Sequence, residues 1–318
     1  MGTVAITDHV FPSIENQRQV IESAGFRLRE IQPVCKTEED VIQRCTEVDV
    51  LLVQWAPITR RVLEALPQVQ CVVRYGIGVD NIDVVAAREL GRTVANVPNY
   101  CFEEVSNHAV AMIISLGRRI PHDHHQIAHG GWGVKALLPI PAFRDLTLGL
   151  IGFGSIARRV AAKATAFDFR LIASDPFAPE SAFRENGVQR VDLNTLLETA
   201  DIITLHCPLL PDTRHLIRRD SIAKMKPRTI LINTSRGPLI KEEDLIEALK
   251  SGKLAGAGLD VFENEPLPPQ SPLRALPNVL LTSHAASVSE SARQKLQNLA
   301  AEAARDYLQG KQPFGIVT

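Results

Sequence analysis

The chain of 318 residues is 45% hydrophobic and 22% charged, a composition typical of a globular protein. This length is more than a single hydrophobic core usually holds, so we expect two domains. Its 35 Lys and Arg balance 36 Asp and Glu. The chain therefore has no net positive charge that would attract nucleic acid or an acidic membrane surface. The sequence has no basic and apolar leader, no bilayer-spanning run and no CxxC pair among its five Cys. These absences disfavour secretion, a membrane span, a disulfide framework and a structural zinc site, and we expect a cytoplasmic protein.

Short β-branched runs alternate with helical periodicity over the first hundred residues, a rhythm that predicts βαβ units around a parallel sheet. The expected elements are a strand at Thr3–Thr7, a helix near Glu15–Ser23, and strands at Val48–Gln54, Val69–Arg74 and Val94–Asn96. Pro98 then interrupts the pattern, because proline cannot continue a helix and biases the preceding residue to extended geometry. We expect a domain hinge there.

Apolar residues recur at helical spacing from Glu103 to Arg119, so a long helix should lead into a second domain. After the Gly- and Pro-rich segment Gly130–Pro141, strands are predicted at Thr147–Gly152, Arg170–Ser174, Asp201–His206, Thr229–Asn233, Gly256–Asp260 and Val279–Thr282. A last helix, Ser289–Leu308, should return to the first domain. The predicted fold is α/β, with a Rossmann NAD-binding domain (101–287) inserted in a discontinuous flavodoxin-like substrate-binding domain (1–100 plus 288–318).

A glycine-rich turn, Gly152-Phe153-Gly154-Ser155-Ile156-Ala157, joins a predicted buried strand to a helix. Its glycines let the backbone approach a pyrophosphate, and the helix N-terminus supplies free N–H groups, although a tight turn alone could also call for glycine. Asp175 closes the next strand, where a carboxylate accepts hydrogen bonds from ribose hydroxyls and repels a 2′-phosphate. The pattern predicts NAD rather than NADP; the alternative is that Asp175 only caps the turn into Pro176.

Three further motifs end predicted strands, at the edge where an open α/β sheet binds its ligands. They contain Arg236 (Asn233–Gly237), Glu265 (Gly258–Pro266) and His284 (Thr282–Ala286). Reduction of a keto acid by hydride transfer needs a cation for the carboxylate and carbonyl, a proton donor for the alkoxide, and an anion that orients this donor. Each residue alone is more often a surface or capping group, but together they predict an active site.

These motifs resemble the D-isomer-specific 2-hydroxyacid dehydrogenase family, and within it the branch of C-terminal-binding proteins and phosphoglycerate dehydrogenase-like enzymes. The resemblance runs nearly end to end and includes Val72–Asp83, Asn96–Cys101, the glycine-rich turn, His206–Leu209 and Thr213–Ile217. It implies an oxidoreductase that transfers a hydride between NAD(H) and a small D-2-hydroxy acid or 2-keto acid. Ser287 departs from the pattern, because the C-terminal-binding branch often has tryptophan there.

The resemblance also implies a role for individual residues. Arg236 would bind the substrate carboxylate and carbonyl, with His284 as the general acid/base and Glu265 as its partner. The implied substrate site further contains Arg74, Ile77 and Gly78. The implied cofactor site contains Gly152, Gly154, Ser155, Ile156, Asp175, Cys207, Pro208, Thr213, Thr234, Ser235, Asp260, Ala286 and Ser287, with Asp260 on the nicotinamide carboxamide. Family members usually pair through their cofactor domains, which implies a homodimer.

The sequence also allows one alternative function and contains two features outside the predicted site. An NAD(H)-sensing, corepressor-like interaction protein would need the glycine-rich turn and Asp175 but would gain nothing from Arg236, Glu265 and His284, so an enzyme is favoured. His125 and His129 have the spacing of a helical zinc pair but no clear third ligand, which favours a solvated helix end and no metal site. Trp55 and Trp132 are expected to be packing residues.

Overall fold

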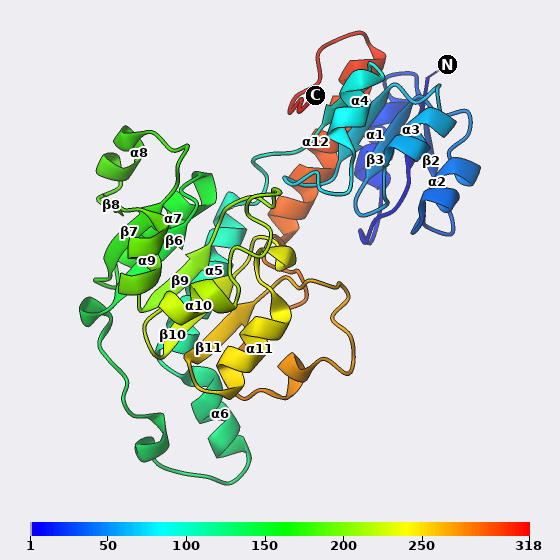
Figure 1. The fold of residues 1–318 in the computed structure, drawn as a ribbon. Helices are drawn as coiled ribbons and strands as arrows, with labels where there is room; N and C mark the ends of the chain where they lie inside the picture. Colours follow the sequence, from blue (N-terminus) through cyan, green and yellow to red (C-terminus); the bar gives the residue numbers. More distant parts are fainter. Residues whose placement is uncertain (1) are drawn as a thin grey trace. The chain divides into compact units, whose positions relative to one another are not determined.

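In the computed structural model, which describes residues 2–318, the chain divides into two compact units. Unit 1 comprises the residues up to Tyr100 together with 288–318, and unit 2 comprises residues 101–287. Each unit is built around a sheet whose strands are all parallel (Figure 1). The predicted α/β class is confirmed.

Unit 1 contains a five-stranded sheet of order β2-β1-β3-β4-β5, the flavodoxin-like order. Its elements are β1 (Thr3–Ile6), α1 (Glu15–Glu22), β2 (Arg27–Glu30), α2 (Glu38–Arg44), β3 (Val50–Val53), α3 (Arg60–Ala65), β4 (Cys71–Arg74), α4 (Val84–Glu89), β5 (Thr93–Ala95) and α12 (Glu290–Leu308). Strand β3, Val-Leu-Leu-Val, is buried throughout, as expected where helices cover both faces of a parallel sheet. Alanines of α12, including Ala300 and Ala304, are buried in the same cluster as Val50 and Leu52. The last helix therefore completes the core of unit 1.

Unit 2 contains a seven-stranded sheet of order β12-β11-β10-β9-β6-β7-β8. Its strands are β6 (Thr147–Ile151), β7 (Arg170–Ser174), β8 (Gln189–Arg190), β9 (Ile202–Leu205), β10 (Thr229–Asn233), β11 (Leu254–Leu259) and β12 (Val279–Leu281). Its helices are α5 (Phe102–Gly117), α6 (Ile120–Ala128), α7 (Ser155–Thr165), α8 (Glu180–Glu185), α9 (Leu193–Thr199), α10 (Arg219–Lys224) and α11 (Glu242–Lys250), with short 3₁₀ turns at Val134–Leu137, Phe143–Asp145, Gly237–Leu239 and Pro272–Ala275. The strand order reverses between β6 and β9, which is the switch point where Rossmann sheets bind dinucleotides.

The predicted strands and helices are confirmed to within a few residues, with identical bounds for β7 and β10. Two edge strands were not predicted, because β2 (Arg-Leu-Arg-Glu) and β8 (Gln-Arg) carry almost no apolar signal. Helix α6 is separate from α5 because Arg119 adopts a left-handed φ of +57° between them. None of the described side chains of α6 is buried, so the histidines are solvated as predicted.

The tryptophan prediction is wrong. Trp132 is 91% exposed and Trp55 is 49% exposed. Trp132 lies between α6 and a short 3₁₀ turn, outside any strand or helix that could carry it onto a core. In the described part of the chain, no helix is long and apolar enough to span a bilayer, and no group of three His, Cys, Asp or Glu side chains is placed to hold a metal ion.

Candidate active site

The two glycines of the glycine-rich turn have different roles: the first is required by the fold, and the second leaves space that a ligand can occupy. Gly152 follows β6 with a φ of +86°, and a Cβ there would lie 2.6 Å from the backbone nitrogen of Cys207. Only glycine fits, so the tight-turn alternative holds at Gly152. Gly154 precedes α7, and a Cβ there would meet nothing within 4 Å. This open space lies at a helix N-terminus, where a phosphate can approach backbone N–H groups.

Asp175 is fixed by three backbone donors. Its Oδ2 accepts from the N–H of Phe153 at 2.7 Å, and its Oδ1 accepts from Phe177 at 2.8 Å and Ala178 at 3.0 Å. The turn-capping alternative is therefore part of its role. A carboxylate offers about four acceptor positions, so acceptor capacity remains for a ribose hydroxyl. The first of these bonds also ties the carboxylate to the glycine-rich turn.

Asp175→Asn should weaken the preference for NADH while keeping the shape of the turn. Hydrogen bonds to a charged acceptor contribute roughly 1.5–3 kcal/mol, so the ratio of kcat/KM for NADH over NADPH should fall roughly 10- to 100-fold. Asp192→Asn is the matched control, because Asp192 also caps a turn, through Thr195, at the start of α9. A wild-type enzyme that used NADPH as well as NADH would contradict this role for Asp175.

Several residues of the predicted cofactor site, on the loops after β9 and β10, bind one another. The Ser235 hydroxyl donates to the Cys207 carbonyl at 2.7 Å, and the Thr213 hydroxyl donates to the Pro208 carbonyl at 2.7 Å. Burial raises the pKa of Cys207 to about 11, so this thiol stays protonated at neutral pH. By contrast, the buried hydroxyl of Thr234 has no hydrogen-bond partner among the described residues. Thr234, like the open face of Gly154, fits a bound dinucleotide.

His284, Glu265 and Arg236 follow β12, β11 and β10, three neighbouring strands whose carboxyl ends lie at one edge of the sheet. His284 Nδ1 lies 2.7 Å from Glu265 Oε2, and both side chains are partly exposed. Glu265 Oε1 accepts from the N–H of Phe262 at 2.9 Å. Because Gly237 would place a Cβ 1.8 Å from the Phe262 carbonyl oxygen, the loop that carries Arg236 packs directly on the loop that carries Glu265.

The charge state of Glu265 decides the role of each histidine nitrogen. Burial opposes its ionisation, but His284, the Phe262 N–H and the charge of Arg236 outweigh burial and hold the pKa of Glu265 below its ordinary value. An ionised carboxylate only accepts hydrogen bonds, so Nδ1 of His284 must carry the proton between them. Nε2 is then the nitrogen that can exchange a proton with a substrate.

Asp260 lies beside this pair but points into the protein. Its carboxylate is 1% exposed and accepts from the Thr282 hydroxyl at 2.5 Å and from the N–H groups of Ala285 at 2.8 Å and Ala286 at 2.9 Å. The His284 N–H donates to the Asp260 backbone carbonyl at 2.8 Å. Asp260 therefore holds the turn that carries His284. Its implied contact with a nicotinamide stays a prediction, as does the place of Ser287 in the cofactor site.

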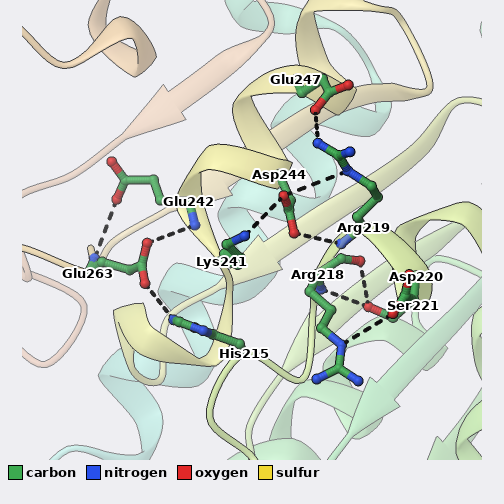
Figure 2. A network of polar contacts seen from close by, with 10 residues as sticks. All are labelled: His215, Arg218, Arg219, Asp220, Ser221, Lys241, Glu242, Asp244, Glu247 and Glu263. Atoms are coloured by element: carbon green, nitrogen blue, oxygen red, sulfur yellow. Dashed lines mark hydrogen bonds and ion pairs between the residues drawn. The ribbon is translucent and has the colours of Figure 1, made fainter.

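Glu263 joins three loops of unit 2, as Figure 2 shows. One oxygen lies 2.6 Å from His215 Nε2 on the loop after β9, and the other accepts from the N–H of Glu242, which begins α11, at 2.8 Å. Burial and the charge of Glu263 raise the pKa of Glu242. Neither His215 nor Glu263 was predicted as a site residue, although both lie inside the quoted motifs. Glu263 stands two residues before Glu265, so this network anchors the loop that carries Glu265.

Of the predicted substrate residues in unit 1, Arg74 ends β4, and Ile77 and Gly78 follow shortly after it. The Arg74 side chain crosses Gly76, where a Cβ would lie 1.4 Å from its Nη1. The Ile77 carbonyl accepts from the Asn96 side chain at 2.6 Å. These contacts give the segment a defined backbone, and its substrate role stays a prediction.

Known proteins are similar to this chain in sequence and in fold. Residues 110–286 match the D-isomer specific 2-hydroxyacid dehydrogenase, NAD binding domain. The D-3-phosphoglycerate dehydrogenase of Methanocaldococcus jannaschii is 37% identical over 100% of this chain, which spans 59% of that protein. The glyoxylate reductase of Korarchaeum cryptofilum is 37% identical over 87% of this chain and 85% of its own length. The apo-structure of D-lactate dehydrogenase from Escherichia coli superimposes with a TM-score of 0.82 at 31% identity, covering 100% of both chains. The chain therefore belongs to the D-isomer-specific 2-hydroxyacid dehydrogenase family.

Proposed function

We propose that this protein is an NAD-dependent dehydrogenase that interconverts a small D-2-hydroxy acid and its 2-keto acid. The observation that carries the proposal is the 2.7 Å contact between His284 Nδ1 and Glu265 Oε2 at the sheet edge that also carries Arg236. A proton donor, its orienting anion and a cation stand together at the carboxyl ends of neighbouring strands. That is the set which reduction of a keto acid requires.

Each residue has a defined task in this reaction. NADH, which would be held by the glycine-rich turn and Asp175, would supply the hydride for this reduction. The Arg236 guanidinium binds the substrate carboxylate and polarises the carbonyl, because its fork of donors matches a carboxylate. His284 donates a proton from Nε2 to the carbonyl oxygen as negative charge develops there. Glu265 keeps Nδ1 protonated and fixes the ring.

A screen of 2-keto acids tests this function directly. Purified protein would be mixed with NADH and glyoxylate, hydroxypyruvate, pyruvate or a branched keto acid, and NADH absorbance followed. We expect turnover with at least one of these acids. The glyoxylate reductase among the relatives makes glyoxylate the first to try. Tight NADH binding without turnover of any acid would contradict the enzyme and favour the NAD(H)-sensing alternative.

We further propose that the protein is a homodimer in the cytoplasm, with small acids rather than nucleic acid as its ligands. Its five buried, free cysteines are typical of a reducing compartment. Large exposed apolar side chains recur along α6 and the segment after it, namely Ile120, Ile127, Trp132, Val134 and Leu138. Such exposure is costly in a monomer and is typical of an interaction surface.

Light scattering at micromolar concentration should give twice the 34.9 kDa chain mass. Trp132→Glu should shift the mass toward the monomer, because a charge buried in an interface is costly. Val85→Glu on α4 is the matched control, since Val85 is also an exposed apolar residue but lies in unit 1. A monomeric wild type would contradict the homodimer.

A further inference from the structure

His108 is a polar residue on α5 that the reaction described above does not use. It lies on the helix face that packs against the unit 2 sheet, with Ala109 and Met112 of the same helix buried beside it. The packing is close, because a Cβ on Gly258 of β11 would lie 3.1 Å from the Met112 side chain. Gly258 stands two residues before Asp260, so the helix places His108 at the end of β11.

A directed chain of hydrogen bonds runs from His108 to Asp260. His108 Nε2 lies 2.9 Å from the Thr282 hydroxyl oxygen, which lies 2.5 Å from Asp260 Oδ1. A hydroxyl has one hydrogen, and the buried carboxylate can only accept, so the Thr282 hydrogen points to Asp260. Thr282 must then accept from His108 Nε2–H. The direct separation of His108 Nε2 from Asp260 Oδ1 is 3.7 Å, too long for a hydrogen bond, so His108 acts through Thr282.

The turn beyond Asp260 needs this support. His284 has a φ of +55°, in the left-handed region that non-glycine residues rarely adopt. Such a backbone persists only where its surroundings determine it, and here the determinants are the bonds from 284–286 to Asp260. A buried carboxylate is itself costly unless donors and positive charge surround it. His108 supports this carboxylate indirectly, by donating to the Thr282 hydroxyl that in turn donates to Asp260 Oδ1.

We propose that His108 is a positioning residue of the active site: through Thr282 it fixes the buried Asp260 carboxylate, and thereby the turn that carries His284. The proposal rests on the function proposed above, because the turn matters only if His284 exchanges the proton. It assigns His108 no contact with substrate or cofactor.

The test compares His108→Leu, His108→Gln and Thr282→Val in the full chain. Leucine removes the donor, whereas glutamine places an amide nitrogen close to the former Nε2. We expect kcat for keto-acid reduction to fall roughly tenfold in His108→Leu, with KM for NADH changed less than about threefold, since the glycine-rich turn and Asp175 are untouched. His108→Gln should recover most of the rate. The double variant His108→Leu/Thr282→Val should be no slower than Thr282→Val alone.

A second measurement needs no turnover. Hydrogen exchange followed by mass spectrometry reads the N–H groups of His284, Ala285 and Ala286, all of which donate to Asp260. These amides should exchange roughly tenfold faster in His108→Leu than in wild type, without cofactor. Asn107→Leu, at the exposed neighbouring position of α5, is the matched control and should match wild type.

Unchanged exchange in His108→Leu would overturn the proposal. So would equal losses of kcat in the His108 and Asn107 variants, or additive losses in the double variant, because both indicate that His108 does not act through Thr282. If wild type reduces no 2-keto acid, the proposed function fails separately. The exchange comparison then still decides whether His108 holds the turn.

Discussion

His284→Ala should lower kcat for keto-acid reduction roughly 10²–10⁴-fold, the usual contribution of a general acid. The reason lies in the pair with Glu265: Nδ1 is engaged at 2.7 Å, which leaves Nε2 as the nitrogen proposed to protonate the carbonyl oxygen. KM for the keto acid should change far less, since Arg236 remains to bind its carboxylate. Steady-state rates of NADH oxidation at one pH provide the comparison.

Loss of folding must be separated from loss of chemistry in this variant. The side chains of His284 and Glu265 are partly exposed, and Glu265 keeps its bond from the Phe262 N–H. We therefore expect the melting temperature of His284→Ala to stay close to that of wild type. His124→Ala, which removes an exposed histidine of α6, should retain full activity. A His284→Ala enzyme with a largely intact rate would show that another group supplies the proton.

The arrangement of the strands could be predicted because buried strands carry a strong apolar signal. β6 and β9 are mostly apolar and largely buried, and their ends carry the glycine-rich turn and the loop with Cys207. β2 and β8 pair with only one neighbour each and are mostly charged or polar. An edge strand needs no apolar pattern, so its sequence resembles a loop.

The meeting of Arg236, Glu265 and His284 at one sheet edge could be predicted because each stands in a short motif at the end of a strand. His108 could not, since its partner Thr282 lies 174 residues further along the chain. On an amphipathic helix, a single histidine looks like any solvated position. Only the packing of α5 on β11 brings it to Asp260.

Hydroxyl groups in the cofactor motifs show another limit of sequence analysis. The sequence places Thr213, Thr234 and Ser235 in one set, but the structure divides them. Thr213 and Ser235 donate to backbone carbonyls of the β9 loop, whereas Thr234 has no hydrogen-bond partner in the described part of the chain. Whether a hydroxyl serves the loop or a ligand depends on tertiary contacts that a motif does not encode.

Glu265→Gln should move the alkaline limit of keto-acid reduction to lower pH. The ionised Glu265 carboxylate accepts the hydrogen bond from Nδ1–H of His284, and the proposed reduction consumes a proton from Nε2 of the same ring. Removing the charge while keeping the shape should shift the alkaline limb of kcat/KM by roughly one pH unit or more. The oxidative direction needs neutral His284, so its acid limb should move the same way.

The same variant has a consequence for stability. The folded-state pKa of Glu265 lies below its ordinary value, so ionised Glu265 stabilises the folded protein above the pKa it has when unfolded. That stabilisation is lost as pH falls through the lowered folded-state pKa. Glu265→Gln should therefore be less stable than wild type near neutral pH, and the difference should shrink in acid. Thermal melting at pH 7 and pH 3 measures it.

The most direct test of the acid–base pair is the pH profile of reductive kcat/KM, measured in parallel for wild type and Glu265→Gln with the best keto acid from the screen. Glu198→Gln, at an exposed glutamate of α9, is the matched control and should follow wild type. We predict that Glu265→Gln loses activity at lower pH than either. Superimposed alkaline limbs in all three proteins would contradict the assignment of Glu265 and His284 as the acid–base pair.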